Sequence, residues 1–157
     1  MLNDFRSCPQ RAFRAHIDHW KGKGDSVHLV AGGAFARGLE VARHSYYEEE
    51  TDAETAIARG TGALLEEYGT FECPELSSKS PERMAGALVA YFDEWPLDKG
   101  AKPTVMPSGR RAIEFSFAEP LPVAHPLTAE PIIYAGRTDM ICDFAGGRYL
   151  EDDKTTT

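Results

Sequence analysis

The sequence predicts an α/β fold in which N-terminal helices pack on a central mixed β-sheet. Apolar residues recur at helical spacing up to about residue 96, and from Arg111 onward they alternate with polar residues. The dipeptide Gly146-Gly147 then separates two runs rich in β-branched and aromatic residues, the pattern of a β-hairpin. We therefore expect one domain over residues 1–157, mainly helical over 1–96 and strand-rich over 104–157.

The helical part is divided by residues that cap or break helices. The four expected helices run from Pro9 to about Trp20, from just after Gly32-Gly33, from Asp52 to Gly69, and from Ser80-Pro81 to Pro96. Their apolar and aromatic residues are expected in the core. For the first helix this expectation covers Phe13, Ile17 and Trp20.

Three strands are expected in the C-terminal part. Ile113, Phe115 and Phe117 alternate with polar residues, as in a half-buried strand. Residues 119–131 are rich in proline and should form a long surface connection. Residues 132–144 and 148–155 then form the hairpin. Glu114, on the first strand, is a further candidate site carboxylate or simply an exposed strand glutamate.

A turn made by Gly146 and Gly147 would gather charged side chains on one face of the hairpin. Asp139 then faces Lys154, and the position beside it holds Asp152 on the same face, because side chains alternate along a strand. The diagonal pair Asp139 and Asp152 would lie about 7 Å apart. A four-residue loop over 145–148 keeps this pairing, whereas a three-residue loop breaks it.

Two carboxylates and an ammonium in one patch suit a divalent metal site. Carboxylate oxygens are ligands that Mg²⁺ prefers, and a neighbouring lysine can orient a water or neutralise charge on a phosphate. The alternative interpretation is a cross-strand salt bridge on a solvated hairpin face, which needs no function.

Four short segments resemble the PD-(D/E)xK nuclease superfamily, in its RecB-like and phage-type exonuclease branch. They follow the order and separations of that family from near Met1 to the last residue. The segments are Leu2-Asn3-Asp4-Phe5-Arg6-Ser7-Cys8-Pro9 followed by Phe13, Gly32-Gly33-Ala34-Phe35 leading to Leu39-Glu40, Gly136-Arg137-Thr138-Asp139, and Asp152-Asp153-Lys154-Thr155.

The resemblance implies a restriction-endonuclease-like core and a metal-dependent DNA nuclease, most simply an exonuclease serving recombination, repair or phage replication. Asp139 and Asp152 would hold Mg²⁺ or Mn²⁺, with the backbone carbonyl of Asp153 as a further ligand. Lys154 would position or activate the attacking water. The partners would be DNA and recombination or phage replication proteins.

Two departures from the family pattern qualify the expectation. Ala36 stands where many members carry a metal-binding histidine, and Glu40, one turn later, is the nearest substitute carboxylate or a solvated helix glutamate. Members also continue from the Lys-Thr pair into a helix that contributes a glutamine and a tyrosine. Because the sequence stops at Thr157, we expect an incomplete C-terminus, an exposed apolar patch beside the hairpin, and weak or absent activity.

The charge distribution leaves room for a nucleic acid despite a net charge of −8. Residues 1–47 hold seven Lys and Arg against four Asp and Glu, whereas the remainder is strongly acidic. Arg6, Arg11, Arg14 and Arg137 are candidate contacts to DNA phosphates. Part of the acidic excess is the proposed metal site itself.

Other classes of protein lack their signals. No apolar run is long enough to span a membrane and no secretory signal is evident, so a cytoplasmic protein is expected. Cys8 matches the Cys-Pro pair of iron–sulfur members of the family, but a cluster is not expected within this chain, because three further cysteines would have to follow Thr157. The sequence has no serine-hydrolase, P-loop or zinc-finger motif.

Two alternatives to the nuclease remain open from the sequence. One is a nuclease-fold DNA-binding module that has lost catalysis, as Ala36 and the missing helix suggest. The other is an unrelated α/β binding protein with a charged hairpin.

Overall fold

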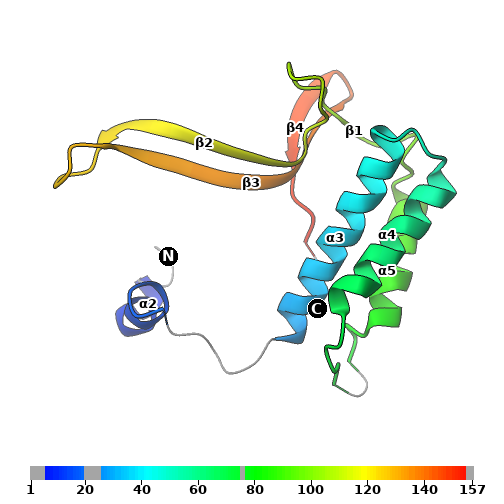
Figure 1. The fold of residues 1–157 in the computed structure, drawn as a ribbon, viewed down its shortest axis with the longest axis horizontal. Coiled ribbons are helices and arrows are strands. Elements are labelled where there is room, and N and C mark those ends of the chain that lie inside the picture. The colour runs from blue at the N-terminus through cyan, green and yellow to red at the C-terminus, as the bar shows by residue number, and fades with distance from the viewer. Residues whose placement is uncertain (1–5, 20–25, 75–76, 155–157) are drawn as a thin grey trace.

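The computed structural model describes residues 6–19, 26–74 and 77–154. Helices precede strands, so the mixed α/β character expected from the sequence is confirmed (Figure 1). The elements are α2 (Pro9–His16), α3 (Val27–Tyr47), α4 (Ala53–Tyr68), α5 (Pro81–Glu94), β1 (Lys102–Pro103), β2 (Ile113–Ala124), β3 (Pro131–Phe144) and β4 (Gly147–Glu151).

Local capping chemistry sets the bounds of two helices as predicted. The Asp52 carboxylate accepts a hydrogen bond from the Thr55 N–H at 2.9 Å, and α4 ends before Gly69, whose φ is +50°. Ser80 caps α5 in the same way, with Pro81 at the first helical position.

The predicted start of the second expected helix, which is α3, is wrong. Ser26 caps α3 by accepting a hydrogen bond from the His28 N–H, so the helix begins before Gly32-Gly33 and runs through it. The packing of this 21-residue helix against α4 and α5 outweighs the low helix propensity of two glycines.

The core of the described residues lies in the three-helix bundle of α3, α4 and α5 (Figure 1). Helices α3 and α4 cross closely at Gly38 and Gly60. A Cβ atom added to Gly60 would lie 2.5 Å from the Gly38 carbonyl oxygen and 2.8 Å from the Ala42 Cβ. Large apolar side chains, including Leu64 and Leu88, fill the space around this crossing and are fully buried.

Strand β3 is the centre of the sheet. Met140 pairs with Ile113 of β2 on one side and with Glu151 of β4 on the other. Every pairing among the described strands is antiparallel, where a mixed sheet was expected. Short turns join β2 to β3 and β3 to β4, and such turns connect antiparallel strands.

The proline-rich residues 119–131 do not form the long connection that was expected. Strand β2 continues to Ala124 and β3 begins at Pro131, so most of this segment extends the β2–β3 hairpin, which projects away from the helices (Figure 1). Pro120 still pairs with Ile133, since a proline is tolerated where its missing N–H would face away from the partner strand.

The β3–β4 turn is formed by Ala145 and Gly146 and not by the two glycines. Their φ angles are +47° and +79°, and Phe144 pairs with Gly147. Gly147 is the first residue of β4, where the Tyr149 hydroxyl lies 2.7 Å from the position that a Cβ atom would take.

This turn shifts the predicted pairing by two residues. A two-residue shift keeps each side chain on its face, but Asp139 no longer faces Lys154. Strand β4 also ends at Glu151, so the prediction that residues 152–154 belong to a strand is wrong. Asp153 instead contacts Asp139, Arg43 and Tyr91.

The expected core positions of the first helix are wrong where they can be checked. Helix α2 ends at His16, and Phe13 and Ile17 are 54% and 62% exposed. Figure 1 shows α2 lying apart from the bundle of α3, α4 and α5, so the bundle does not cover Phe13 and Ile17. Trp20 lies outside the described residues.

No helix within residues 6–19, 26–74 and 77–154 combines the length and apolar character needed to cross a membrane.

We predict opposite effects of alanine at two glycines of α4. Gly60→Ala should lower the free energy of unfolding by about 1–3 kcal/mol, because its methyl group would overlap the α3 backbone. Gly62→Ala should raise it by about 1 kcal/mol, because Gly62 has open space and alanine favours helix. Urea unfolding followed by circular dichroism measures both. Equal changes in the two variants would contradict the close α3–α4 crossing.

Candidate functional site

Asp139 and the segment that follows β4 meet at one place in the structure. Asp139 lies on β3, and its Oδ2 accepts a hydrogen bond from the Asp153 N–H at 2.6 Å. The Thr138 hydroxyl donates to the Glu151 carbonyl at 3.1 Å. The first aspartate of the predicted site is therefore joined directly to the Asp-x-Lys segment.

Lys154 pairs with Asp152 at the exposed edge of this place. The Lys154 Nζ lies 2.5 Å from the Asp152 Oδ1, and both side chains are largely exposed. The pKa of Lys154 is raised, first by its hydrogen bond to Asp152 and then by the charges of Asp152, Asp139 and Asp153. The charges of Asp139 and Asp152 therefore both act on the Lys154 ammonium.

A second acidic residue lies beside Asp139, on the neighbouring strand β2. Glu114 of β2 falls between the pairs Ile113–Met140 and Phe115–Thr138, so it lies opposite Asp139. Its φ of +50° interrupts the regular strand pairing at this position.

Arg137 connects this group to helix α3. Its Nε donates a short hydrogen bond to the Glu114 Oε2, and its Nη2 lies 4.0 Å from the Glu40 Oε1. Glu40 is also paired with Arg37, at 2.7 Å. Glu40, the candidate substitute ligand, therefore lies near Glu114, while Arg137, a candidate phosphate contact, lies between two carboxylates and stays 57% exposed.

The charges of this patch are not balanced. Burial raises the pKa of Glu114, Arg137 opposes that effect, and the charges of Asp139 and Glu40 raise it further. We define the acidic patch as Glu40, Glu114 and Asp139, with Arg137 among them. It joins α3, β2 and β3.

Arg43 of α3 holds the other side of the segment after β4. Its guanidinium is buried and binds two carboxylates, with Nη2 2.5 Å from the Glu151 Oε1 and Nη1 3.1 Å from the Asp153 Oδ2. Its Nη2 also donates to the Tyr91 hydroxyl at 3.0 Å, and that hydroxyl donates to the Asp153 Oδ1 at 3.1 Å.

This network stays ionised at its centre. Burial alone would lower the pKa of the Arg43 guanidinium, but Tyr91, Asp153 and Glu151 raise it above its ordinary value. Burial, and then the charge of Asp153, raises the pKa of Glu151, while Arg43 opposes the rise. The arginine is therefore a fixed positive charge between two acids.

Sequence reasoning missed Arg43, Tyr91 and Glu151. A signal was present for Arg43, since it follows Leu39 by four residues and so lies on the apolar face of its helix. A charged residue on a core face requires a buried partner.

A cavity of about 690 Å³ opens beside this network, between the end of α5 and the β3–β4 hairpin. Apolar and aromatic side chains dominate its lining, among them Phe92, Trp95 and Met140. On the hairpin, Phe144, Tyr149 and Leu150 are all more than half exposed. The apolar patch expected beside the hairpin is therefore confirmed.

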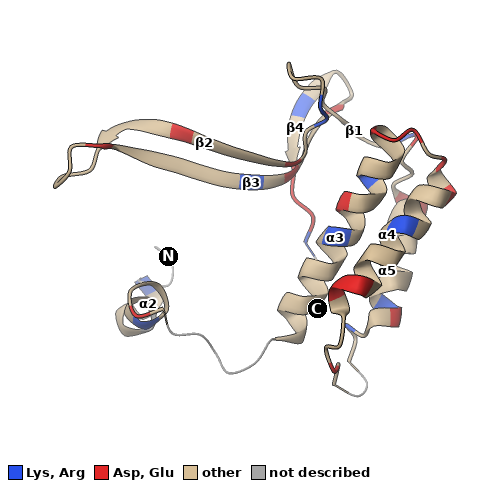
Figure 2. Ribbon diagram, in the orientation of Figure 1, with Lys and Arg blue, Asp and Glu red and all other residues tan. Residues whose placement is uncertain are grey.

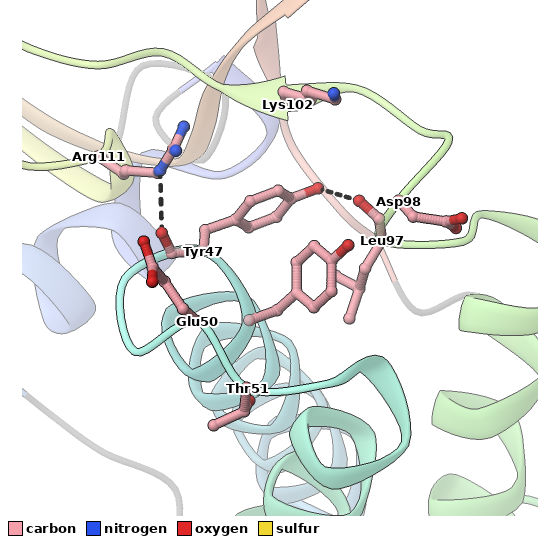
Figure 3. A pocket seen from close by; sticks show the side chains of 8 residues that line it. Tyr47, Glu50, Thr51, Leu97, Asp98, Lys102 and Arg111 are labelled. Atoms are coloured by element: carbon pink, nitrogen blue, oxygen red, sulfur yellow. Dashed lines mark hydrogen bonds between the residues drawn. The ribbon is translucent and has the colours of Figure 1, made fainter.

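A smaller hollow of about 370 Å³ lies where α3 ends, and Figure 3 shows its lining. The Tyr47 hydroxyl donates to the Leu97 carbonyl at 2.6 Å, and Arg111 Nε donates to the Tyr47 carbonyl at 3.1 Å. Burial raises the pKa of Tyr47 to about 12, so its hydroxyl stays a neutral donor. These contacts join α3 to the strands and bring no acid–base pair together.

Candidate phosphate contacts near the N-terminus lie apart from this site. Arg6 and Arg14 are exposed, Arg14 on helix α2, while the side chain of Arg11 is outside the described residues. The distal part of the β2–β3 hairpin carries no Lys or Arg between Ala112 and Gly136, and Figure 2 shows it almost free of charged residues.

Within the parts of the chain that the structure describes, no three His, Cys, Asp or Glu side chains are grouped so as to hold a metal ion. The backbone of Asp153, expected to offer its carbonyl to a metal, contacts Asp139 through its N–H.

Comparison with protein-family models, with curated proteins and with solved structures finds no match to this chain.

We predict that the pKa of Glu114 responds in opposite directions to its two neighbours. Arg137→Gln should raise it further, because the opposing positive charge is lost, and Asp139→Asn should lower it. NMR titration of the Glu114 carboxyl carbon measures both. A carboxyl with a raised folded-state pKa stabilises the fold fully below its unfolded pKa and loses that stabilisation as pH rises through the folded value. Glu114→Gln should therefore flatten the fall of unfolding free energy over this interval. No response to Asp139→Asn would contradict the acidic patch.

Proposed function

We propose that this chain is a divalent-metal-dependent DNA nuclease of restriction-endonuclease-like fold. Its site would lie where Asp139 meets residues 152–154. The observation that carries the proposal is the 2.6 Å hydrogen bond from the Asp153 N–H to the Asp139 carboxylate. It places the first aspartate against the Asp-x-Lys segment, although the predicted strand pairing was wrong.

The chemistry of the proposed ligands suits Mg²⁺ or Mn²⁺, and a bound ion would have to draw them together, because no three acidic, His or Cys side chains of the described residues are grouped to hold one. Asp139 and Asp152 would supply carboxylate oxygens, and the backbone carbonyl of Asp153 would be a further oxygen ligand. When bound, a divalent ion supplies Lewis-acid stabilisation of charge on the phosphate and lowers the pKa of a water. Lys154, exposed beside Asp152, can orient the water or neutralise a phosphate oxygen.

The electrostatics of the acidic patch favour a cation. The raised pKa of Glu114 reflects burial and also the charges of Asp139 and Glu40, which Arg137 does not fully offset. A DNA phosphate would be repelled by such a patch on its own. A bound divalent ion reverses the local sign and makes phosphate binding favourable.

The proposal includes DNA as substrate and an exonuclease role in recombination, repair or phage replication. Lys154 and Arg137 are both more than half exposed beside Asp139, so phosphate can reach them. The four sequence segments that resemble the nuclease superfamily support this class of substrate.

One observation favours a DNA-binding module of nuclease fold without catalysis. Asp139 already accepts the Asp153 N–H, and Lys154 is already paired with Asp152, so the residues proposed for catalysis satisfy one another. This second candidate shares the site and differs only in lacking the reaction.

We predict that Asp152→Ala abolishes any Mg²⁺- or Mn²⁺-dependent cleavage of linear DNA, which we expect to be weak in the 157-residue chain, and weakens Mn²⁺ binding at least about 100-fold. The physical reason is the loss of a carboxylate ligand. Cleavage of end-labelled single- and double-stranded DNA, and Mn²⁺ binding measured by electron paramagnetic resonance, provide the readouts.

Asp143→Asn is the matched control. Asp143 lies on the same face of β3 as Asp139 but is exposed and paired with Arg148 at 3.0 Å, away from residues 152–154. It should leave cleavage and Mn²⁺ binding unchanged. Full activity of folded Asp152→Ala protein would refute the nuclease site. DNA binding without cleavage by the unaltered chain would select the inactive module.

A further inference from the structure

Arg43 is the most buried charged group of the site described above, and it comes from the helical part of the chain. It sits on α3, whose neighbouring residues Leu39 and Ala42 are in the core, and its side chain is only 5% exposed. The acids that it binds lie 108 and 110 residues later. One side chain thus fixes the end of β4 to the bundle.

The two acids bound by Arg43 flank Asp152. Glu151 precedes it and Asp153 follows it, and both carboxylates turn toward the guanidinium. The side chain of Asp152 is 59% exposed and reaches Lys154 instead. Holding both neighbours therefore fixes the direction in which Asp152 points.

The contacts of the Asp153 side chain also orient its backbone toward Asp139. The Asp153 side chain is held on one side by Arg43 and by the Tyr91 hydroxyl, while its N–H donates to the Asp139 carboxylate. If Asp153 were released from Arg43, the Tyr91 hydroxyl alone among these contacts would still hold its side chain, and the N–H would be less firmly directed at Asp139.

A guanidinium suits this position better than an ammonium. Its two terminal nitrogens serve different partners, Nη1 for Asp153 and Nη2 for Glu151 and Tyr91. A lysine places its donors on one nitrogen and cannot span two carboxylates with the same planar geometry. Loss of either acid would leave a buried charge under-compensated.

We propose that Arg43 is a positioning residue of the nuclease site: by gripping Glu151 and Asp153, it holds Asp152 and Lys154 beside Asp139. Its catalytic consequence rests on the proposed function, whereas its effect on the geometry of residues 151–154 does not. Arg43 is buried and touches no reacting atom, so it acts through the residues that it holds.

The geometric part is tested by amide hydrogen exchange at Asp153, measured by NMR on the full chain. In Arg43→Lys and Arg43→Gln the protection of the Asp153 N–H should fall at least tenfold, with α4 amides unchanged. Arg59→Gln is the matched control, because Arg59 makes an exposed pair with Glu49 at 2.5 Å on the bundle surface. It should leave Asp153 protection unchanged.

Tyr91→Phe and Asp153→Asn keep the test decisive if the Arg43 variants fail to fold. Each weakens the hold on Asp153 while Arg43 keeps its ion pair with Glu151, and each should lower Asp153 protection in a folded protein. Unchanged protection in every folded variant of the network would overturn the proposal.

The catalytic part is tested by the split between kcat and KM. In Arg43→Lys, kcat for Mg²⁺-dependent cleavage should fall at least tenfold while KM for DNA stays within twofold, because the buried side chain cannot touch DNA. Lower Asp153 protection with no cleavage by the unaltered chain would retain the geometric role and reject the nuclease. Normal cleavage with normal protection in Arg43→Lys would reject the positioning role and retain the nuclease.

Discussion

A buried positive charge must be neutralised where it lies, and in this protein that requirement brings the end of the sheet to the helices. Arg43 lies on the core face of α3, and within the described part of the chain the carboxylates that it binds are those of residues 151 and 153. The segment after β4 therefore leaves the sheet and turns toward α3. The meeting of Asp139 with residues 152–154 is a consequence of that ion pair.

Helix α3 can connect the bundle to the strands because its two sides make different contacts. On one side Gly38 meets Gly60 of α4, and the absence of both side chains lets the two helices approach closely. On the other side Arg43 reaches Glu151 of β4, and Tyr47 contacts Leu97 and Arg111. Tyr47 and Arg111 tie the helix to the start of the strands, and Arg43 ties it to their end. The candidate site lies beside the Arg43 contacts, on β3, which pairs with β2 on one side and with β4 on the other.

What the sequence predicts well is what local chemistry decides. Asp52 and Ser80 mark helix starts because a side-chain oxygen satisfies an N–H three residues away. The two glycine pairs led to wrong element boundaries, because their roles depend on other parts of the chain. Packing of the bundle keeps α3 helical through Gly32-Gly33. At Gly146-Gly147, the Tyr149 side chain occupies the space beside Gly147. Arg43 could not be paired with its acids from sequence, because they lie more than a hundred residues away.

The proposed function and the buried ion pair together divide the site into fixed and movable parts. The side chains of Glu151 and Asp153 are held by Arg43, whereas those of Asp152 and Lys154 are largely exposed and paired with each other. An exposed ion pair contributes little stability, so exchanging Lys154 for a divalent ion at Asp152 costs little. The backbone that presents Asp152 need not move in that exchange. In the nuclease that we propose, the ion would therefore meet a preorganised main chain, and only two exposed side chains would rearrange to receive it.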